Sequence, residues 1–175
     1  MKMDRKKGLF SYTLIEVMIS TGVIAMIIGG VMTEYVSLLK GYEMVNIYRD
    51  LHSQARYGID VFTRDMRAAS AISSGTSNTI TFAVPLASGT QTVSYALTSN
   101  KLMRTTLLAG VTNTTTVAEN VESVEFDYYL RDNTATTNAT MAFNVQAWVT
   151  CSKGVAGVQK VDFIHTRTLM RNKHS

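Results

Sequence analysis

The sequence predicts an α+β fold in which one long N-terminal helix, partly transmembrane, packs on an antiparallel β-sheet. Two observations lead to this prediction. Apolar residues fill the chain from Tyr12 to Met32 and continue at helical spacing to about Ala69. Beyond residue 70, short runs alternate between apolar and polar residues, as in strands that have one covered face. The chain has 175 residues, which is enough for such a helix and one globular domain with its own core.

The N-terminal residues predict a membrane anchor. The first eleven residues form a leader with four basic residues and one acidic residue, namely Lys2, Arg5, Lys6, Lys7 and Asp4. The next 21 residues, Tyr12 to Met32, contain a single charge, Glu16. A helix needs about 20 apolar residues to cross a bilayer, whereas the apolar region of a cleaved secretory signal is shorter. Because the basic residues precede the span, we expect a cytoplasmic N-terminus and a single crossing.

The helix is expected to continue beyond the span as an amphipathic segment. Its apolar residues recur mostly at steps of three and four, and no proline interrupts them. They are Val36, Leu39, Tyr42, Val45, Leu51, Ala55, Ile59, Phe62, Met66 and Ala69. We expect this apolar stripe to pack against the protein's own sheet.

After Ser70 the composition changes to that of strands and turns. A turn cluster is expected at residues 73–78. Strands are expected at residues 79–84, 92–97, 101–106, 121–130, 141–150 and 160–169. The threonine-rich stretches at residues 112–117 and 133–140 are expected to be loops. The expected organisation is therefore a leader (1–11), a transmembrane half-helix (12–34), an amphipathic half-helix (35–70) and a β-rich globular domain (71–175).

The composition argues against a nucleic-acid-binding or catalytic role. Residues 12–175 hold 13 basic and 12 acidic side chains, so the chain's net charge of +4 comes mainly from the leader, and no basic face is indicated. The single cysteine, Cys151, is expected to be a small buried hydrophobe. His52, His165 and His174 lack metal-ligand spacing, and no nucleophile or phosphate-loop motif is present. We predict no enzymatic activity, no cofactor and no metal.

A motif lies where the apolar run begins. Residues 11–16 read S-Y-T-L-I-E, a small residue and an aromatic residue followed by T-L-I-E. The motif resembles the class III signal of type IV prepilins and type II secretion pseudopilins, in which Gly precedes the scissile bond, Phe follows it and Glu is the fifth mature residue. The resemblance implies cleavage between Ser11 and Tyr12, where Ser stands for Gly and Tyr for Phe. Cleavage after Gly8 is the alternative, and it would make Glu16 the eighth mature residue.

The resemblance also implies roles for these residues. In this family the new N-terminal amine is methylated, and the Glu of an incoming subunit pairs with the amine of its neighbour. Tyr12 would then carry the methylated amine, and Glu16 would make the subunit–subunit pairing. A carboxylate in an apolar span is costly and usually functional, which agrees with that role.

The same resemblance implies partners and a location. The partners are prepilin peptidase, other minor and major pilins or pseudopilins, and the inner-membrane assembly platform. The location is the bacterial inner membrane, crossed once, with the globular domain periplasmic or extracellular, and then the filament.

Further stretches are most similar to pseudopilin J and the PilW-type minor pilins. Residues 64–69 read R-D-M-R-A-A and match an R-D-[LM]-R-x-A pattern at the helix end of those proteins. Residues 95–97 and 102–104 resemble their paired strands, and residues 121–129 resemble their V-x-S-[LV]-x-F-x-Y strand. The resemblance implies a pilin-like fold and a minor subunit that primes assembly at or near the filament tip. The alternatives are a major, shaft-forming pilin and a membrane-anchored domain that enters no filament.

Overall fold

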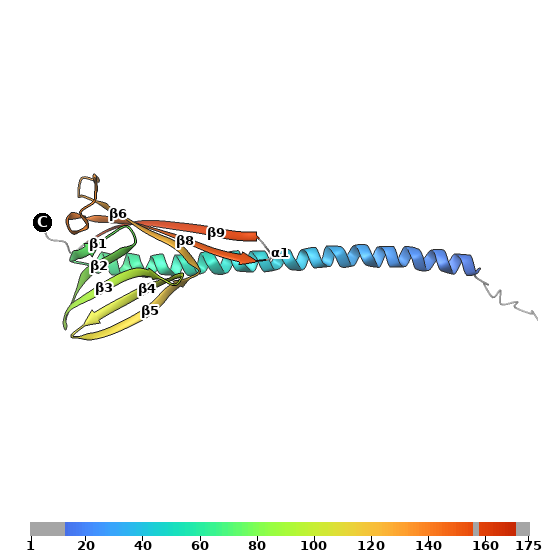
Figure 1. The fold of residues 1–175 in the computed structure, drawn as a ribbon, viewed down its shortest axis with the longest axis horizontal. Coiled ribbons are helices and arrows are strands. Elements are labelled where there is room, and N and C mark those ends of the chain that lie inside the picture. The colour runs from blue at the N-terminus through green and yellow to red at the C-terminus, as the bar shows by residue number, and fades with distance from the viewer. Residues whose placement is uncertain (1–12, 156–157, 171–175) are drawn as a thin grey trace, which may run out of the picture. The chain divides into compact units, whose positions relative to one another are not determined.

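The fold is α+β, with one long apolar N-terminal helix and antiparallel sheets (Figure 1). The structure is a computed structural model that describes residues 13–155 and 158–170. Helix α1 extends from Leu14 to Ala68, as predicted from its apolar spacing and its lack of proline. The chain divides into two compact units, Met1–Glu43 and Met44–Ser175. The first contains the N-terminal part of α1, and the second contains the remainder of α1 and all the strands that are described.

The second unit contains two antiparallel sheets rather than the single sheet that we predicted. Sheet A has five strands in sequential order, namely β1 (Ala71–Gly75), β2 (Thr79–Leu86), β3 (Gly89–Thr98), β4 (Lys101–Leu108) and β5 (Val111–Glu119). Sheet B has four strands in the order β7-β6-β8-β9, namely β6 (Val121–Tyr129), β7 (Ala135–Thr136), β8 (Asn144–Val155) and β9 (Val158–Leu169). A short 3-10 helix, η1 (Ala139–Met141), precedes β8.

The loop prediction for residues 112–117 is wrong. These residues belong to β5, which pairs with β4 along its length. Thr114 Oγ1 lies 3.1 Å from Thr105 Oγ1 on β4, so these two threonines form a cross-strand pair. Threonine is β-branched and favours extended backbone, and we gave too little weight to that preference. The turn cluster predicted from residue 73 is also partly wrong, because residues 73–75 belong to β1.

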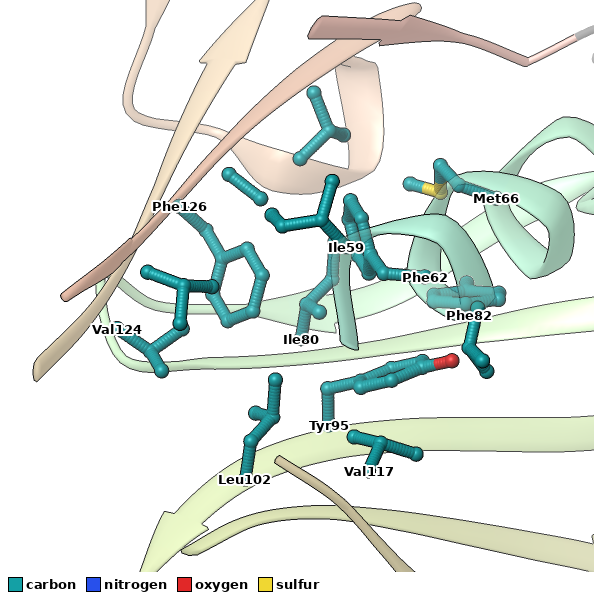
Figure 2. Close-up of a cluster of buried hydrophobic side chains, with 14 of the residues drawn as sticks. Ile59, Phe62, Met66, Ile80, Phe82, Tyr95, Leu102, Val117, Val124 and Phe126 are labelled. Atoms are coloured by element: carbon teal, nitrogen blue, oxygen red, sulfur yellow. The ribbon is translucent and has the colours of Figure 1, made fainter. Parts of the chain in front are cut away.

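One face of the C-terminal part of α1 forms the centre of the core. The predicted stripe is buried from residue 51 onward, at Leu51, Ala55, Ile59, Phe62, Met66 and Ala69. Phe62 is 2% exposed, and its ring centroid lies 5.3 Å from that of Tyr95 on β3 and 5.5 Å from that of Phe126 on β6. Figure 2 shows Phe62 among side chains from both sheets. A single helical side chain therefore joins sheet A to sheet B.

The N-terminal part of the predicted stripe is exposed. Val36, Leu39, Tyr42 and Val45 are 48%, 50%, 69% and 56% exposed, so the prediction is wrong for these residues. The reason is that helical spacing identifies an apolar face but does not identify what covers it.

Gly75 allows the two sheets to approach each other closely. The hydroxyl of Tyr128 on β6 donates a hydrogen bond to the carbonyl oxygen of Thr76, at 2.8 Å. A Cβ atom at position 75 would overlap that same hydroxyl. Only glycine leaves room for the tyrosine there, and this contact connects β6 with the end of β1.

Candidate functional site

The predicted processing site is at the start of the chain, and only part of the motif can be placed. Ser11 and Tyr12 lie outside the described residues, so cleavage between them and methylation of Tyr12 remain predictions. Glu16 lies in the first turn of α1 and is exposed. The structure therefore shows the surroundings of the predicted pairing carboxylate within a single subunit.

Glu16 and Thr13 bond to each other and cap the helix. The Thr13 backbone N–H donates to Glu16 Oε2 at 3.3 Å, and the Glu16 backbone N–H donates to Thr13 Oγ1 at 3.4 Å. This reciprocal arrangement is a capping box, which occupies backbone donors that a helix start otherwise leaves unpaired. The carboxylate also lies at the positive end of the helix dipole, which stabilises its charge. The T-x-x-E spacing in the sequence is a signal for this cap, and our sequence analysis missed it.

The N-terminal part of α1 is long and apolar enough to span a membrane. An 18-residue window in it has a mean hydropathy of 2.1, and none of that window is buried. Its hydroxyl side chains bond within the helix, as when Ser20 Oγ donates to the Glu16 carbonyl oxygen at 2.7 Å and Thr33 Oγ1 donates to that of Gly29 at 2.9 Å. Such bonds satisfy polar groups where the surroundings offer no partner. This helix therefore suits an apolar environment.

Small residues recur at every fourth position along the same part of α1. They are Thr21, Ala25, Gly29, Thr33, Ser37 and Gly41. A Cβ atom added at Gly29 or Gly41 would meet no atom within 4 Å. Small residues at this spacing let the backbones of neighbouring helices approach closely in membranes. This pattern was also missed in our sequence analysis, although the spacing alone reveals it.

Exposed apolar side chains continue along α1 beyond the length of a bilayer crossing. Counted from Leu14, about 20 residues reach Thr33. Large apolar side chains that are exposed follow this point, namely Tyr35, Val36, Leu38, Leu39, Tyr42, Val45 and Tyr48. Contiguous apolar surface of this kind on a protein usually marks a contact with a partner.

The R-D-M-R-A-A stretch attaches the end of α1 to sheet A. Asp65 is 8% exposed, and it accepts hydrogen bonds from the Tyr95 hydroxyl at 2.7 Å and from Arg104 Nε at 2.5 Å. Tyr95 on β3 and Arg104 on β4 are directly opposite each other in the sheet. Burial and the nearby Asp65 charge raise the pKa of Tyr95, so its hydroxyl stays protonated and donates. The matched residues 64–69 thus have a structural explanation that requires no ligand.

The outer face of sheet B carries a cluster of aromatic and charged side chains. The Trp148 ring stacks on His165 with centroids 4.5 Å apart, and Trp148 Nε1 donates to Asp127 Oδ2 at 3.1 Å. The guanidinium of Arg167 lies 4.0 Å from the centroid of the Tyr129 ring. Asp127 and Tyr129 are on β6, Trp148 is on β8, and His165 and Arg167 are on β9. The contacts therefore extend across three strands of sheet B, and side-chain contacts between strands stabilise an exposed sheet face.

Side chains of metal-ligand type and the single cysteine are the other candidate site residues. Among residues 13–155 and 158–170, no group of three His, Cys, Asp or Glu side chains is placed to hold a metal ion. Cys151 is buried, which confirms the prediction made for it. No protein-family model and no curated protein matches this chain.

Proposed function

We propose that this protein is a structural subunit of a filament of the type IV pilus or type II secretion pseudopilus kind. The observation that supports this most directly is the length of exposed apolar surface on α1. A bilayer accounts for about 20 residues of it, but the exposed apolar side chains continue to Tyr48. Outside the membrane that surface would face water unless other helices cover it. A filament built around a bundle of subunit helices provides that cover, and the small residues of α1 suit close helix packing.

The residues at the start of α1 would have the roles that the motif implies. Prepilin peptidase cleaves between Ser11 and Tyr12, and the new amine of Tyr12 is methylated. Glu16 then pairs with the amine of a neighbouring subunit. The bonds between Glu16 and Thr13 support this role, because they give the carboxylate a partner within its own chain before a neighbour arrives. Without such a partner, a carboxylate within an apolar segment is costly.

The proposal includes a location and a place in the filament. The protein is inserted in the bacterial inner membrane with its N-terminus in the cytoplasm, and the assembly platform moves it into the filament. The similarity of residues 64–69 and 121–129 to pseudopilin J and the PilW-type proteins favours a minor subunit near the tip that primes assembly together with other minor subunits.

Intact-mass measurement and N-terminal sequencing of the membrane form test the processing step. The mature chain is expected to begin at Tyr12 with a methylated amine. A chain that begins at Leu9 would move the cleavage to Gly8, and a membrane form that retains Met1 would contradict the proposal. Quantitative mass spectrometry of sheared filaments then gives the copy number, which is low for a minor subunit and high for a shaft subunit. Absence from the filaments would favour a membrane-anchored domain.

A further inference from the structure

Exposed charges on α1 form two pairs with the same spacing. The acidic residues Glu43 and Asp50 are seven residues apart, and so are the basic residues Arg49 and Arg56. All four lie in α1 and are exposed. Seven residues make nearly two helical turns, so each pair lies along one side of the helix. The first pair is named the acidic edge and the second the basic edge.

The two edges are too far apart to pair within one chain. Each basic residue follows an acidic residue by six positions, which places the edges about 120° apart around the helix and about 9 Å apart along it. Ion pairs within a helix join residues three or four apart. Asp50 accepts a hydrogen bond from Gln54 Nε2, at 3.1 Å. In residues 13–155 and 158–170, none of the four charged side chains takes part in an ion pair.

One displacement between two parallel copies matches the acidic edge of one with the basic edge of the other. When the first copy is raised by six residues, its Glu43 lies level with Arg49 of the second copy. Its Asp50 then lies level with Arg56. At nearly equal height only one such pair can form, Asp50 with Arg49. The six-residue stagger is therefore favoured, because it forms two pairs of opposite charge.

Exposed apolar side chains continue both edges toward the N-terminus of α1. Val36 lies seven residues before Glu43, and Tyr42 lies seven residues before Arg49. Their side chains are 48% and 69% exposed. In parallel helices, charges beside an apolar contact set the partner and the register. The charge pairs thus suit a helix contact in which apolar side chains supply most of the affinity.

We propose that in the filament the acidic edge of one copy packs against the basic edge of the next copy, with a stagger of about 9 Å along α1. The contact is heterologous, so it can repeat from copy to copy. All copies of α1 then point in the same direction, as anchoring in one membrane requires. The inference rests on the proposed function and extends it by naming the neighbour and the height of the contact.

The stagger separates copies in the filament from copies in the membrane. Two copies anchored at the same depth cannot form both charge pairs, because identical residues are then level with each other. The contact forms when the assembly platform has raised one copy above the next. The pairing proposed for Glu16 has the same direction, since Glu16 would lie beside a lower-numbered residue, Tyr12, of the raised neighbour.

Charge reversal in the full chain tests the contact. Glu43→Arg with Asp50→Arg makes both edges basic, and Arg49→Glu with Arg56→Glu makes both edges acidic. Each double variant is expected to fall roughly fivefold or more in the ratio of sheared filament to membrane fraction, since two attractive pairs become repulsive. The chain with all four substitutions exchanges the edges and should return to the ratio of the unaltered chain.

A matched control and a mixture identify the partner. Glu122→Arg with Glu125→Arg changes the net charge by the same amount at exposed positions of β6, and it should be incorporated normally. Coexpression of the two reversed chains should restore both, because they can alternate. If the edges instead contact an unlike subunit, neither the mixture nor the fourfold variant recovers, which would overturn the proposal. Normal incorporation of either double variant alone would also overturn it.

Cysteine cross-linking of filaments tests the stagger. Coexpressed Glu43→Cys and Arg49→Cys chains should give a disulfide-linked dimer under mild oxidation, since the natural Cys151 is buried. Asp50→Cys with Arg49→Cys would link chains at nearly equal height and should give little dimer. The reverse result would refute the stagger.

The unaltered chain separates the two levels of inference. If it is processed but absent from sheared filaments, the filament assignment and this contact are both wrong. If it is present in filaments but the reversed chains do not rescue each other, the contact alone is wrong.

Discussion

The two parts of α1 have the same secondary structure, but their apolar side chains are exposed in the N-terminal part and largely buried in the C-terminal part. In residues 14–43 the large apolar side chains are exposed all around the helix, with Met26 81% exposed. In residues 51–68 most of them form one buried face, and Leu51 and Met66 on it are fully buried, whereas Tyr57 is exposed. A helix that is apolar on all sides requires lipid or other helices around it, whereas a helix with one stripe requires a single covering surface. One unbroken helix thus serves two environments, and only its pattern of apolar residues separates them.

Polar side chains in the two parts differ in the same way. Ser20 and Thr33 bond to the carbonyl oxygens of their own helix, as side chains do where no outside partner is available. Asp65 instead bonds to Tyr95 and Arg104 on two strands of sheet A. The first arrangement leaves the helix independent of its surroundings, and the second fixes it to a sheet. The N-terminal part therefore makes no such bonds to a sheet through these side chains, while the C-terminal part is bonded to the domain.

The largest effect on stability is expected from the centre of the core. Phe62→Ala removes the side chain that joins the two sheets, and it should lower the free energy of unfolding by about 3–5 kcal/mol. Tyr57→Ala on the exposed side of the same helix is the matched control and should change it by about 0.5 kcal/mol or less. Urea unfolding of the detergent-solubilised chain, followed by the fluorescence of the single tryptophan, Trp148, measures both. Equal losses in the two variants would contradict the division of α1 into a buried and an exposed face.

A smaller effect is expected where α1 is attached to sheet A. Arg104→Met keeps an unbranched apolar side chain but leaves the buried Asp65 carboxylate with Tyr95 and the more distant Arg64, whose Nε lies 3.9 Å from Asp65 Oδ1, which should cost about 2 kcal/mol. Lys101→Met breaks the 2.6 Å ion pair between Lys101 and Glu119. Their side chains are 47% and 51% exposed, respectively. It should cost about 1 kcal/mol or less, because water screens an exposed pair. The same unfolding measurement compares them, and a greater loss in Lys101→Met would refute the anchoring role of Asp65.

The sequence was informative where a pattern is local. The three- and four-residue spacing of Leu51, Ala55 and Ile59 predicted a buried helical face correctly. The same spacing at Val36 and Leu39 led to a wrong prediction of burial, since periodicity identifies an apolar face but not what covers it. The threonines of residues 112–117 were misassigned because a polar composition was given more weight than β-branching.

Contacts between distant parts of the chain could not be predicted in this way. Asp65 and Arg104 are 39 residues apart, and they meet only because β3 and β4 pair in one particular register. Register depends on turns and bulges that a single sequence does not specify well. Ser11 and Tyr12, by contrast, belong to a motif whose role no part of the described structure tests, so their processing stays a prediction.

The smallest effect on stability is expected at the start of α1, where two variants separate charge from capping. Glu16→Gln loses the charge but keeps an acceptor for the Thr13 backbone N–H, because glutamine also serves in a capping box. Thr13→Val keeps the charge but removes the hydroxyl that accepts from the Glu16 backbone N–H. The loss of a cap typically costs about 1 kcal/mol, and this loss is confined to the first turn of an exposed helix, so both variants should insert and fold like the unaltered chain.

Their incorporation into filaments should differ strongly. If Glu16 pairs with the amine of a neighbouring subunit, Glu16→Gln should be depleted from sheared filaments, or from complexes with other minor subunits, while Thr13→Val is incorporated at nearly the normal level. Glu16→Ala loses both the charge and the hydrogen-bond acceptor of the cap. It should behave like Glu16→Gln, with membrane insertion and leader cleavage intact. Immunoblots of the sheared fraction against the membrane fraction measure the ratio for each variant. Normal incorporation of Glu16→Gln together with failure of Thr13→Val would show that the acid acts as a helix cap, since only the variant with the damaged cap would then be affected.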